Sequence, residues 1–591
     1  MDPICTLAVV GAGTAGCVLA ARLSEDPNTK VLLIEAGDRM SYFTKIPLTP
    51  TVAQQGPYDW SVRTTPQKYS SFGLWNQSQI IPRGKGLGGS GQINFMMHGV
   101  GLPKDYERWE SLGFKGWSFK DLRPYFVKAF GTASAECDPE MCSADGRCPY
   151  SSIRFENKKA ASIYILKNHR ELDNIFVNKE IVLAAGSVKT PQILMLSGVG
   201  PEKLLKKLKI KVIARNEQVG KNLHDHMNTP VYVSIERPIS ITLSKIFKFN
   251  TLWDYVWNRK GLLSFPPMAG VEYFGNSALM LFAMGSASER LMRDLSNYKH
   301  EVFRKTFPFH HSSSKEGFIF LATCTQPRSR GTVSLSDIST NTPPLVNPNY
   351  LQNGRDVKCI VKALKRIIKI VSSKPFRDIG AKIHWPRPER CQSFWNGSRT
   401  SKKIPKPAKT LNKDLVKRTT VAENDKKDRV KMNTGNNFVS DDYLECVVRE
   451  VAVTGHHAGG TCAGGTVVDH KLRLKSVTGV RIMDASVMPS PTSLYPNSVL
   501  VSMAEKAAEI IKHDPAIHHD TLQKTTDRRG GGRKCVKHVR QNGLQADQVY
   551  IAQAQVSENK TKDANRCGIN SAFYRKKFAE VNTIKTTQQC H

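Results

Sequence analysis

The order of apolar and polar residues at the start of the chain is typical of a strand, a turn and a helix. Residues 7–10 form a short apolar run that predicts a buried strand. A second apolar run, residues 31–34, ends at a glutamate, Glu35. Between the two runs, an alanine-rich helical segment begins at three glycines in G-x-G-x-x-G spacing: Gly11, Gly13 and Gly16. This order predicts a βαβ unit whose glycine turn joins the first strand to the helix.

The pattern further along predicts more elements of both kinds. Buried strands are expected over 180–186 and 479–484. Residues 190–196 are expected to begin a helix with Pro191 at its first position, where proline is favoured. Residues 131–179 show no clear period. Other helices are expected over residues 105–109, 119–126, 356–370, 441–448 and 497–511.

The net charge bears on the class of partner. The chain of 591 residues carries a formal charge of +35, which suggests nucleic acid or an anionic surface. However, the charge concentrates over 399–431 and after Asp514, in stretches poor in apolar periodicity. Such stretches are more often solvated loops, and they lack the interleaved aromatic residues on which bases stack. Nucleic acid is therefore not expected as a partner, and a binder of nucleic acid or of an anionic surface remains a secondary alternative.

Neither a membrane span nor a secretory signal is visible in this sequence. No apolar run approaches the length of a transmembrane helix, and Asp2 and Pro3 stand where a signal would have a basic region. The thirteen cysteines are an odd number, so at least one is unpaired or joined to another chain. A metal site is not expected, because a local disulfide suits the spacing of one cluster better than zinc does: Cys137, Cys142 and Cys148.

The first glycine motif implies a specific chemistry. Gly11 permits a tight turn, Gly13 lets the backbone approach a pyrophosphate, and Gly16 lets the helix lie close to the sheet. The helix N-terminus is then directed at the phosphates, and a carboxylate at the position of Glu35 binds a ribose hydroxyl. A dinucleotide site is therefore expected at the end of the first strand.

A second glycine-rich block lies within residues 81–98. Glycine costs backbone entropy, so five glycines within eight residues favour a chain that lies flat against a large ligand. A flexible linker is the alternative, and it is less favoured because the apolar pattern resumes at once with Ile93 and Phe95.

Taken together, these motifs resemble the glucose–methanol–choline (GMC) family of FAD-dependent oxidoreductases, and most of all its arthropod glucose-dehydrogenase-like branch. The similarity runs in the family's order from residue 4 to about 512, apart from residues 397–432. The segments that carry it are the first glycine motif with Glu35, residues 83–94, 186–201, 219–226, 457–462 and 481–489, and the pair Pro496 and Asn497.

The resemblance implies an α/β fold with a doubly wound, Rossmann-like sheet that binds FAD, and a substrate domain with an antiparallel sheet and flanking helices. The family's reaction oxidises a CH–OH group: a histidine takes the hydroxyl proton and the carbinol hydride goes to flavin N5. Matched by motif, that base is His457. If the segment is extended, only one of His456 and His457 faces the flavin, and His456 is the alternative. Tyr495 stands at the position of the second substrate-facing group. The implied FAD contacts are Gly11, Gly13, Thr14, Gly16, Glu35, Arg83, Gly84, Gly89, Ser90, Asn94, Met96, Asp484 and Asn497.

The resemblance also suggests how the chain is divided. Residues 1–230 are expected to form the N-terminal part of the FAD-binding domain, irregular and shortened over 130–180. The other expected parts are a substrate-binding domain (231–392), a basic insertion of low order (393–437), a C-terminal part of the FAD-binding domain that carries the catalytic histidine (438–512), and a basic tail of low order (513–591).

Three departures from the family's pattern leave a catalytically impaired relative, with or without FAD, as the first alternative to an active enzyme. The position of Tyr495 is usually an asparagine or a histidine. The stretch between Cys148 and Ile181 is too short for the strands that the family has there, and His98 and Val100 replace an aromatic residue and an arginine.

The expected partners are a small alcohol or sugar substrate and an unidentified electron acceptor, either oxygen or a quinone- or dye-like carrier. An NAD dehydrogenase is less favoured, because a nicotinamide enzyme has no need of the second glycine block. The cellular location is left open, although relatives of this type are often secreted.

Overall fold

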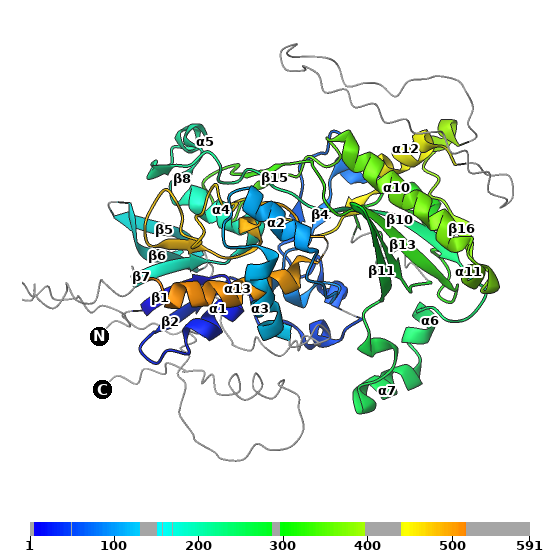
Figure 1. Ribbon diagram of the computed structural model, residues 1–591, viewed down its shortest axis with the longest axis horizontal. Helices are drawn as coiled ribbons and strands as arrows, with labels where there is room; N and C mark the ends of the chain where they lie inside the picture. The colour runs from blue at the N-terminus through cyan, green and yellow to red at the C-terminus, as the bar shows by residue number, and fades with distance from the viewer. Residues whose placement is uncertain are drawn as a thin grey trace, which may run out of the picture.

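The computed structural model describes residues 5–48, 50–130, 150–156, 158–167, 170–285, 293, 296–395, 439–493 and 495–515. Within these residues the chain forms two large sheets, each with its own apolar core (Figure 1). One sheet contains parallel strands and the other is antiparallel, and helices pack against both. The predicted α/β class is therefore confirmed.

The first sheet is built around a parallel βαβ unit. Strand β1 (Cys5–Val10) lies parallel to β2 (Val31–Ile34), and α1 (Thr14–Leu23) connects them. On its other side β1 pairs with β7 (Arg170–Leu183), which in turn pairs with β18 (Val480–Ile482), both in parallel. The closing helix α13 (Pro496–Lys512) packs on α1. The sheet is thus assembled from segments far apart in the sequence.

Two antiparallel strands, β5 (Tyr150–Glu156) and β6 (Lys159–Lys167), extend this sheet beyond β7 where the sequence predicted none. Strand β5 pairs with β6, and β6 pairs with the first part of β7. The sequence analysis expected residues 130–180 to be irregular, whereas in the structure they form strands from Tyr150 onward.

Helix α4 (Gly186–Leu196) begins four residues earlier than predicted, so that Pro191 lies inside it. A proline in a helix leaves the carbonyl four residues before it without its N–H partner. Here that carbonyl belongs to Ser187, and the hydroxyl of Thr461 donates to it at 2.6 Å. A side chain from a distant segment therefore supplies the hydrogen bond that the helix lacks.

The second sheet is antiparallel, in the order β11-β12-β13-β10-β16. Its strands are β11 (Met268–Phe274), β12 (Ser277–Phe282), β13 (Gly317–Cys324), β10 (Met227–Ser234) and β16 (Lys382–His384). The long helix α10 (Gly354–Val371) lies across β12 and β13 (Figure 1). It buries the apolar stripe that its sequence predicts: Val357, Ile360, Val361, Leu364 and Ile367.

Helix α12 (Asp441–Val451) belongs with the second sheet and not with the first. It packs on α10, and the short β17 (Val453–Thr454) that follows pairs with β10. The sequence assigned residues 438–512 to the nucleotide-binding part, because one amphipathic helix does not reveal which core its apolar face meets. In the structure the chain returns to the first sheet only after Thr454.

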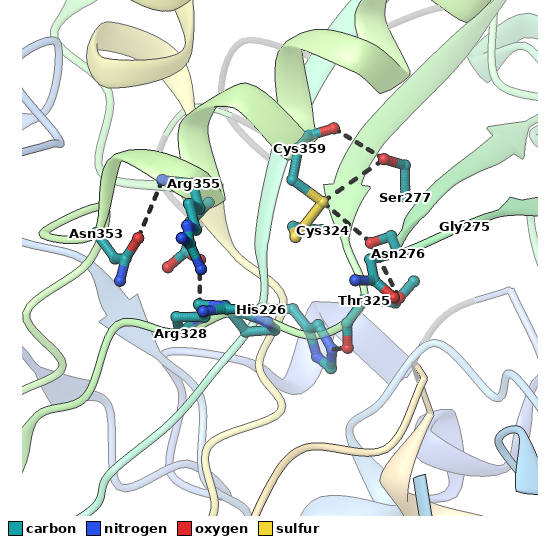
Figure 2. Close-up of a disulfide and its surroundings, with 12 residues drawn as sticks. His226, Gly275, Asn276, Ser277, Cys324, Thr325, Arg328, Asn353, Arg355 and Cys359 are labelled. Carbon is teal, nitrogen blue, oxygen red and sulfur yellow. Dashed lines mark hydrogen bonds between the residues drawn. A yellow bond between two sulfur atoms is a disulfide. The ribbon is translucent and has the colours of Figure 1, made fainter. Parts of the chain in front are cut away.

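Two disulfides join elements around the second sheet. Cys324 at the end of β13 is bonded to Cys359 on α10 (Figure 2). Cys391, in the 3-10 helix η8 (Glu389–Phe394), is bonded to Cys446 on α12. The sequence analysis predicted neither pair, and its three candidate cysteines lie outside the described residues. Cys17 and Cys462 are free thiols.

The remaining elements are short and lie between or beside the two sheets. Paired strands are β3 (Val62–Arg63) with β4 (Ile80–Ile81), β8 (Val199–Gly200) with β9 (Ala214–Arg215), and β14 (Thr332–Ser334) with β15 (Leu345–Asn347). The helices are α2 (Pro103–Ser111), α3 (Phe119–Phe130), α5 (Glu202–Lys207), α6 (Leu243–Ile246), α7 (Phe249–Asn258), α9 (His300–Thr306) and α11 (Lys374–Asp378). Short 3-10 helices include η1 (Tyr42–Lys45), η4 (Gly89–Gln92), η6 (Leu262–Ser264) and η9 (Ala485–Val487).

Among the described residues, no helix combines the length and the apolar character that crossing a bilayer requires. The described chain ends just after α13. There Asp514, which the sequence assigned to the tail, is buried and accepts a hydrogen bond at 2.7 Å from the buried guanidinium of Arg481.

Candidate active site

The first glycine motif has two glycines that the protein itself requires and one that it does not. Gly11 has a φ of +105°, and a Cβ on Gly16 would lie 1.8 Å from the Gly11 carbonyl oxygen. A Cβ on Gly13 would meet only the Cα of Gly89, at 4.0 Å. Protein packing therefore leaves Gly13 free to carry a side chain, and its absence keeps space open at the N-terminus of α1, where no side chain caps the helix.

The second glycine block packs directly on the first. The amide of Gly88 donates to the carbonyl of Ala12 at 2.8 Å, and a Cβ on Gly89 would lie 2.8 Å from the Cα of Gly13. A Cβ on Gly84 would lie 2.1 Å from the carbonyl carbon of Gly89, and the Ser90 hydroxyl accepts from the Gly84 amide. The two blocks meet backbone to backbone, which only glycine permits.

Glu35 connects these two blocks. Its carboxylate accepts hydrogen bonds from the amides of Ala12 at 2.8 Å, Gly37 at 3.0 Å and Gly86 at 3.1 Å. Burial raises the pKa of Glu35 to about 7, although these amides favour the charged form. The predicted contact with a ribose hydroxyl stays a prediction, and a carboxylate that already accepts three hydrogen bonds has capacity for another.

Thr14 and Asn497 lie together although 483 residues separate them. The Thr14 hydroxyl donates to Asn497 Oδ1 at 2.8 Å. Both residues begin helices, α1 and α13, and η4 lies against them, because a Cβ on Gly91 would be 2.8 Å from Thr14 Oγ1. The predicted cofactor contacts from the two ends of the chain thus converge on one place.

Asp484 is directed at the start of α4. Its carboxylate accepts from the amide of Gly186 at 2.9 Å, the hydroxyl of Thr190 at 2.6 Å and the amide of Ser486 at 2.7 Å. Burial raises the pKa of Asp484. The structure therefore gives Asp484 a positioning role between α4 and η9, and its contact with a cofactor stays a prediction.

Arg83 connects the glycine block to the histidine loop. Its guanidinium donates to the carbonyl of His456, and burial lowers the pKa of Arg83. Asn94 Oδ1 accepts from the amide of Met96 at 2.7 Å, and Met96 has a φ of +53°. His456 and Tyr495 also have positive φ, +64° and +37°. Strained backbone of this kind clusters at functional sites.

A buried carboxylate organises the loop that carries the two histidines. Asp225 Oδ1 accepts from the amides of His226 at 2.8 Å and His457 at 2.7 Å. Its other oxygen, Oδ2, accepts from the hydroxyls of Tyr350 at 2.5 Å and Thr454 at 2.6 Å. Asp225 thereby fixes the backbone of His457 against β10.

The ring of His457 is hydrogen-bonded to the ring of His226. The two Nδ1 atoms are 3.0 Å apart, and His226 Nε2 is 3.0 Å from the carbonyl oxygen of Thr325. A carbonyl only accepts, so His226 Nε2 carries the proton, and the neutral ring then presents a lone pair at Nδ1. His457 Nδ1 must therefore donate, which leaves His457 Nε2 unprotonated. Figure 2 shows His226 beside Thr325, next to the Cys324–Cys359 bond.

From the sequence, the choice between His456 and His457 was argued for an extended segment. In the structure this segment is not extended. With its φ of +64°, His456 turns its ring onto Phe95, to which it stacks with centroids 6.2 Å apart. The two rings still contact different partners. The cause is a local turn, and not the alternation of side chains along a strand.

Both rings are kept neutral by their surroundings. Burial lowers the pKa of His457 well below its ordinary value, and the neighbouring His226 and His456 add to the effect. Burial also lowers the pKa of His456, to about 3, with Arg83 contributing.

Tyr495 lies beside His457, with its ring edge-to-face at 6.2 Å between centroids. Its hydroxyl contacts the sulfur of Met268 at 2.9 Å, and burial raises the pKa of the phenol. His98 has other partners, because its Nδ1 is 2.9 Å from the hydroxyl of Ser498 and its ring meets Phe130.

Sequence reasoning found the histidines but not the residues that hold them. Asp225 and His226 lie within the segment 219–226, but the sequence pattern gave neither of them a role. It gave no indication of Tyr350, Thr454 or Thr325. Asp225 and His226 come directly before the buried strand β10, and this position could have indicated a functional role. Among the described residues, His, Cys, Asp and Glu form no group of three suited to a metal ion.

Comparison with known proteins gives matches to two family models, both described as GMC oxidoreductase. The N-terminal model matches residues 6–145 and 147–228, and the C-terminal model matches residues 327–504. The chain is 34% identical over 561 residues to the Drosophila melanogaster protein "Neither inactivation nor afterpotential protein G", covering 85% of this chain and 90% of that one. It is 27% identical over 589 residues to "Glucose dehydrogenase [FAD, quinone]" of the same organism, covering 85% and 86%.

Solved structures share the fold at lower sequence identity. Pyridoxine 4-oxidase from Mesorbium loti aligns with a TM-score of 0.63 at 20% identity, covering 86% of this chain and 99% of that one. A formate oxidase aligns with a TM-score of 0.66 at 18% identity, again covering 86% and 99%.

Proposed function

The chain belongs to the GMC oxidoreductase family and is thus an FAD-dependent oxidoreductase that acts on CH–OH groups; from this premise we propose that His457 is its catalytic base. In this proposal His457 Nε2 accepts the hydroxyl proton of an alcohol or sugar. The observation that carries the proposal is the pair of hydrogen bonds from His457 Nδ1 to His226 and from His226 to the Thr325 carbonyl.

The residues around the two glycine blocks fit FAD. The open space at Gly13 and the uncapped N-terminus of α1 suit a pyrophosphate, and the carboxylate of Glu35 suits a ribose. The proposed further contacts are Thr14, Arg83, Gly84, Gly89, Ser90, Asn94, Met96, Asp484 and Asn497. When bound, FAD supplies the acceptor for the carbinol hydride.

The protein's own contribution is to keep one nitrogen lone pair available. A general base must hold its lone pair within hydrogen-bond reach of the proton that it takes. With its proton on Nδ1, His457 has this lone pair on Nε2. The lowered pKa keeps the ring neutral at physiological pH. Asp225, through the amide of His457, holds the backbone in place.

Tyr495 is proposed as the second substrate-facing group. Its ring lies beside His457, and its phenol can donate a hydrogen bond to an alkoxide oxygen. The raised pKa keeps that phenol protonated. Tyr495→Phe tests this role, because it removes the hydroxyl and keeps the ring.

The test of the proposal is the rate at which alcohols and sugars reduce the bound flavin, measured anaerobically by stopped-flow absorbance. Replacing His457 by alanine should lower this rate by roughly 10² to 10⁴, the usual contribution of a positioned base. The FAD content should not change. His456→Ala is the matched control. The ring of His456 stacks on Phe95, so its removal should lower the rate of flavin reduction much less.

The same experiment separates the alternatives. A larger loss in His456→Ala than in His457→Ala would move the base to His456. If the parent protein binds FAD but no alcohol or sugar reduces it, the chain is the catalytically impaired relative. Reoxidation by oxygen or by a quinone in the same instrument identifies the class of electron acceptor.

A further inference from the structure

Helix α7 leaves its apolar face uncovered. The apolar residues Phe249, Leu252, Trp253, Val256 and Trp257 recur at the spacing of a single helix face. Such a face normally packs on a core, yet no residue of α7 is buried. Phe249 is 72% exposed and Trp257 is 65% exposed. Figure 1 shows α6 and α7 projecting from the body below the second sheet.

The aromatic rings on this face form a continuous strip. Phe249 and Trp253 have centroids 5.8 Å apart, and Trp253 stacks on Trp257 at 4.2 Å with an interplanar angle of 5°. Further exposed aromatic residues come from the flanking loops and from η1. We define the aromatic patch as Tyr42, Phe43, Phe247, Phe249, Trp253, Trp257 and Phe265.

Basic residues lie at both ends of α7. Lys248 directly precedes the helix, and Arg259 and Lys260 directly follow it, all three exposed. Arg259 also connects α7 to η1, because its guanidinium donates to the hydroxyl of Tyr42 at 3.2 Å. The ends of the patch therefore present positive charge beside exposed aromatic rings.

We propose that the aromatic patch docks on an anionic phospholipid membrane surface. Tryptophan and phenylalanine on one face of a helix, with lysine and arginine beside them, are the residues of helices that lie in the headgroup region. Lys248, Arg259 and Lys260 are complementary to an anionic leaflet. A second copy of the chain would bring the same positive charges together, which opposes self-association through this face.

The patch is joined to the candidate active site by a short stretch of chain. The short η6 leads from α7 into β11, and the first residue of β11, Met268, is in contact with the Tyr495 hydroxyl. A docked molecule would therefore have its membrane contact one short connection away from Tyr495.

The test is co-flotation of the full-length, FAD-loaded protein with vesicles. We expect binding to phosphatidylcholine vesicles that contain a quarter of phosphatidylserine, and weaker binding to pure phosphatidylcholine. Trp253→Ala with Trp257→Ala should reduce binding roughly tenfold or more, since each exposed aromatic ring contributes apolar area. Lys248→Glu with Lys260→Glu should reduce binding to the anionic vesicles only.

The matched control is Phe176→Ala on β7, which removes an aromatic ring of 57% exposure outside the patch. It should bind as the parent does, and equal melting temperatures would show that all variants are folded. Absence of vesicle binding, or binding that the tryptophan variant retains in full, would overturn the proposal. So would a dimer, detected by sedimentation in the absence of vesicles, that the tryptophan variant abolishes.

Discussion

The position of one proton decides whether His457 can act as a base. An imidazole whose Nδ1 accepts has its proton on Nε2, the atom that must take the substrate's proton. The Thr325 carbonyl excludes a proton on His457 Nε2. It forces His226 Nε2 to donate, so that His226 Nδ1 accepts and His457 Nδ1 must carry the proton. His226 is thus a positioning residue, and it acts through His457.

Substitutions at His226 test this role. Replacing His226 by phenylalanine removes the acceptor for His457 Nδ1, and flavin reduction should slow by about 10- to 100-fold, as when the partner of a functional histidine is lost. His226→Asn should restore most of the rate, because its Oδ1 can accept from His457 Nδ1. Nitrogen chemical shifts of His457 should show Nε2 unprotonated in the parent and in His226→Asn, and a mixture of tautomers in His226→Phe. Equal rates in all three proteins would remove His226 from the mechanism.

At this scale the sequence predicted the identity of the candidate base and not its surroundings. His457 could be predicted because it belongs to a motif with a fixed order of neighbours. The hydrogen bond to His226 spans 231 residues, and Tyr350 reaches Asp225 from 125 residues away. Contacts at such separations depend on how the two sheets meet, which no local pattern contains.

Among the elements, the glycine turn shows how packing and ligand binding can be separated. Gly16 lies against the backbone of Gly11, whereas Gly13 faces open space. The same motif therefore holds one glycine for the fold and another for the cofactor.

Two alanine substitutions distinguish these uses. Gly16→Ala should prevent stable folding, because its Cβ would lie 1.8 Å from a backbone oxygen that cannot move away. Gly13→Ala should leave the apoprotein as stable as the parent in urea, and Gly13→Val should bind little or no FAD in flavin absorbance titrations. If Gly13→Val retains its flavin, the pyrophosphate does not lie at the N-terminus of α1.

Periodicity predicted the long helices well and some of the strands poorly. Helices α10 and α13 follow their apolar stripes closely, and the four-residue β2 has the predicted ends. Strands β5 and β6, with seven and nine residues, were missed because their stretch of the sequence has no clear period. The stripe on α7 was not recognised as a surface either, because spacing alone does not tell a buried face from an exposed one.

For the whole molecule, four histidines in and next to the active site make stability depend on pH. Burial lowers the pKa values of His224, His226, His456 and His457 below their ordinary value. In the unfolded chain each histidine protonates near pH 6.5. Below that pH the unfolded state binds more protons than the folded one, so stability falls as the pH is lowered.

The free energy of unfolding should therefore decrease below pH 6.5 by up to about 1.4 kcal/mol per pH unit for each of these four histidines. Glu35 has the opposite sign: its raised pKa, about 7, removes stability as the pH rises from 4.5 to 7. Burial also raises the pKa values of Asp484 and Glu450. The four histidines outweigh these carboxyls, so the net slope should be positive between pH 5.5 and 6.5. Urea unfolding at pH 5.5, 6.5 and 7.5 measures it.

His456→Gln should reduce this slope by about one proton's contribution. A parent protein equally stable at pH 5.5 and 6.5 would mean that these rings are protonated in the folded state.

The arrangement of the two sheets was only partly predictable. The resemblance to the GMC family implied that the FAD-binding part is assembled from separate segments, residues 1–230 and 438–512. They did not show that α12 packs on α10, or that β17 pairs with β10. An amphipathic helix fits either core equally well until tertiary contacts select one.

The Cys391–Cys446 bond encloses residues 396–438 in a covalent ring that closes on the second sheet. Cutting the backbone anywhere within that ring would leave a molecule in which η8 and α12 are still bonded, and with them everything before residue 396 and everything after residue 438. A protease that nicks the insertion would thus produce two fragments that separate only after reduction. The bond makes this part of the chain a place where the backbone can be opened without dividing the protein.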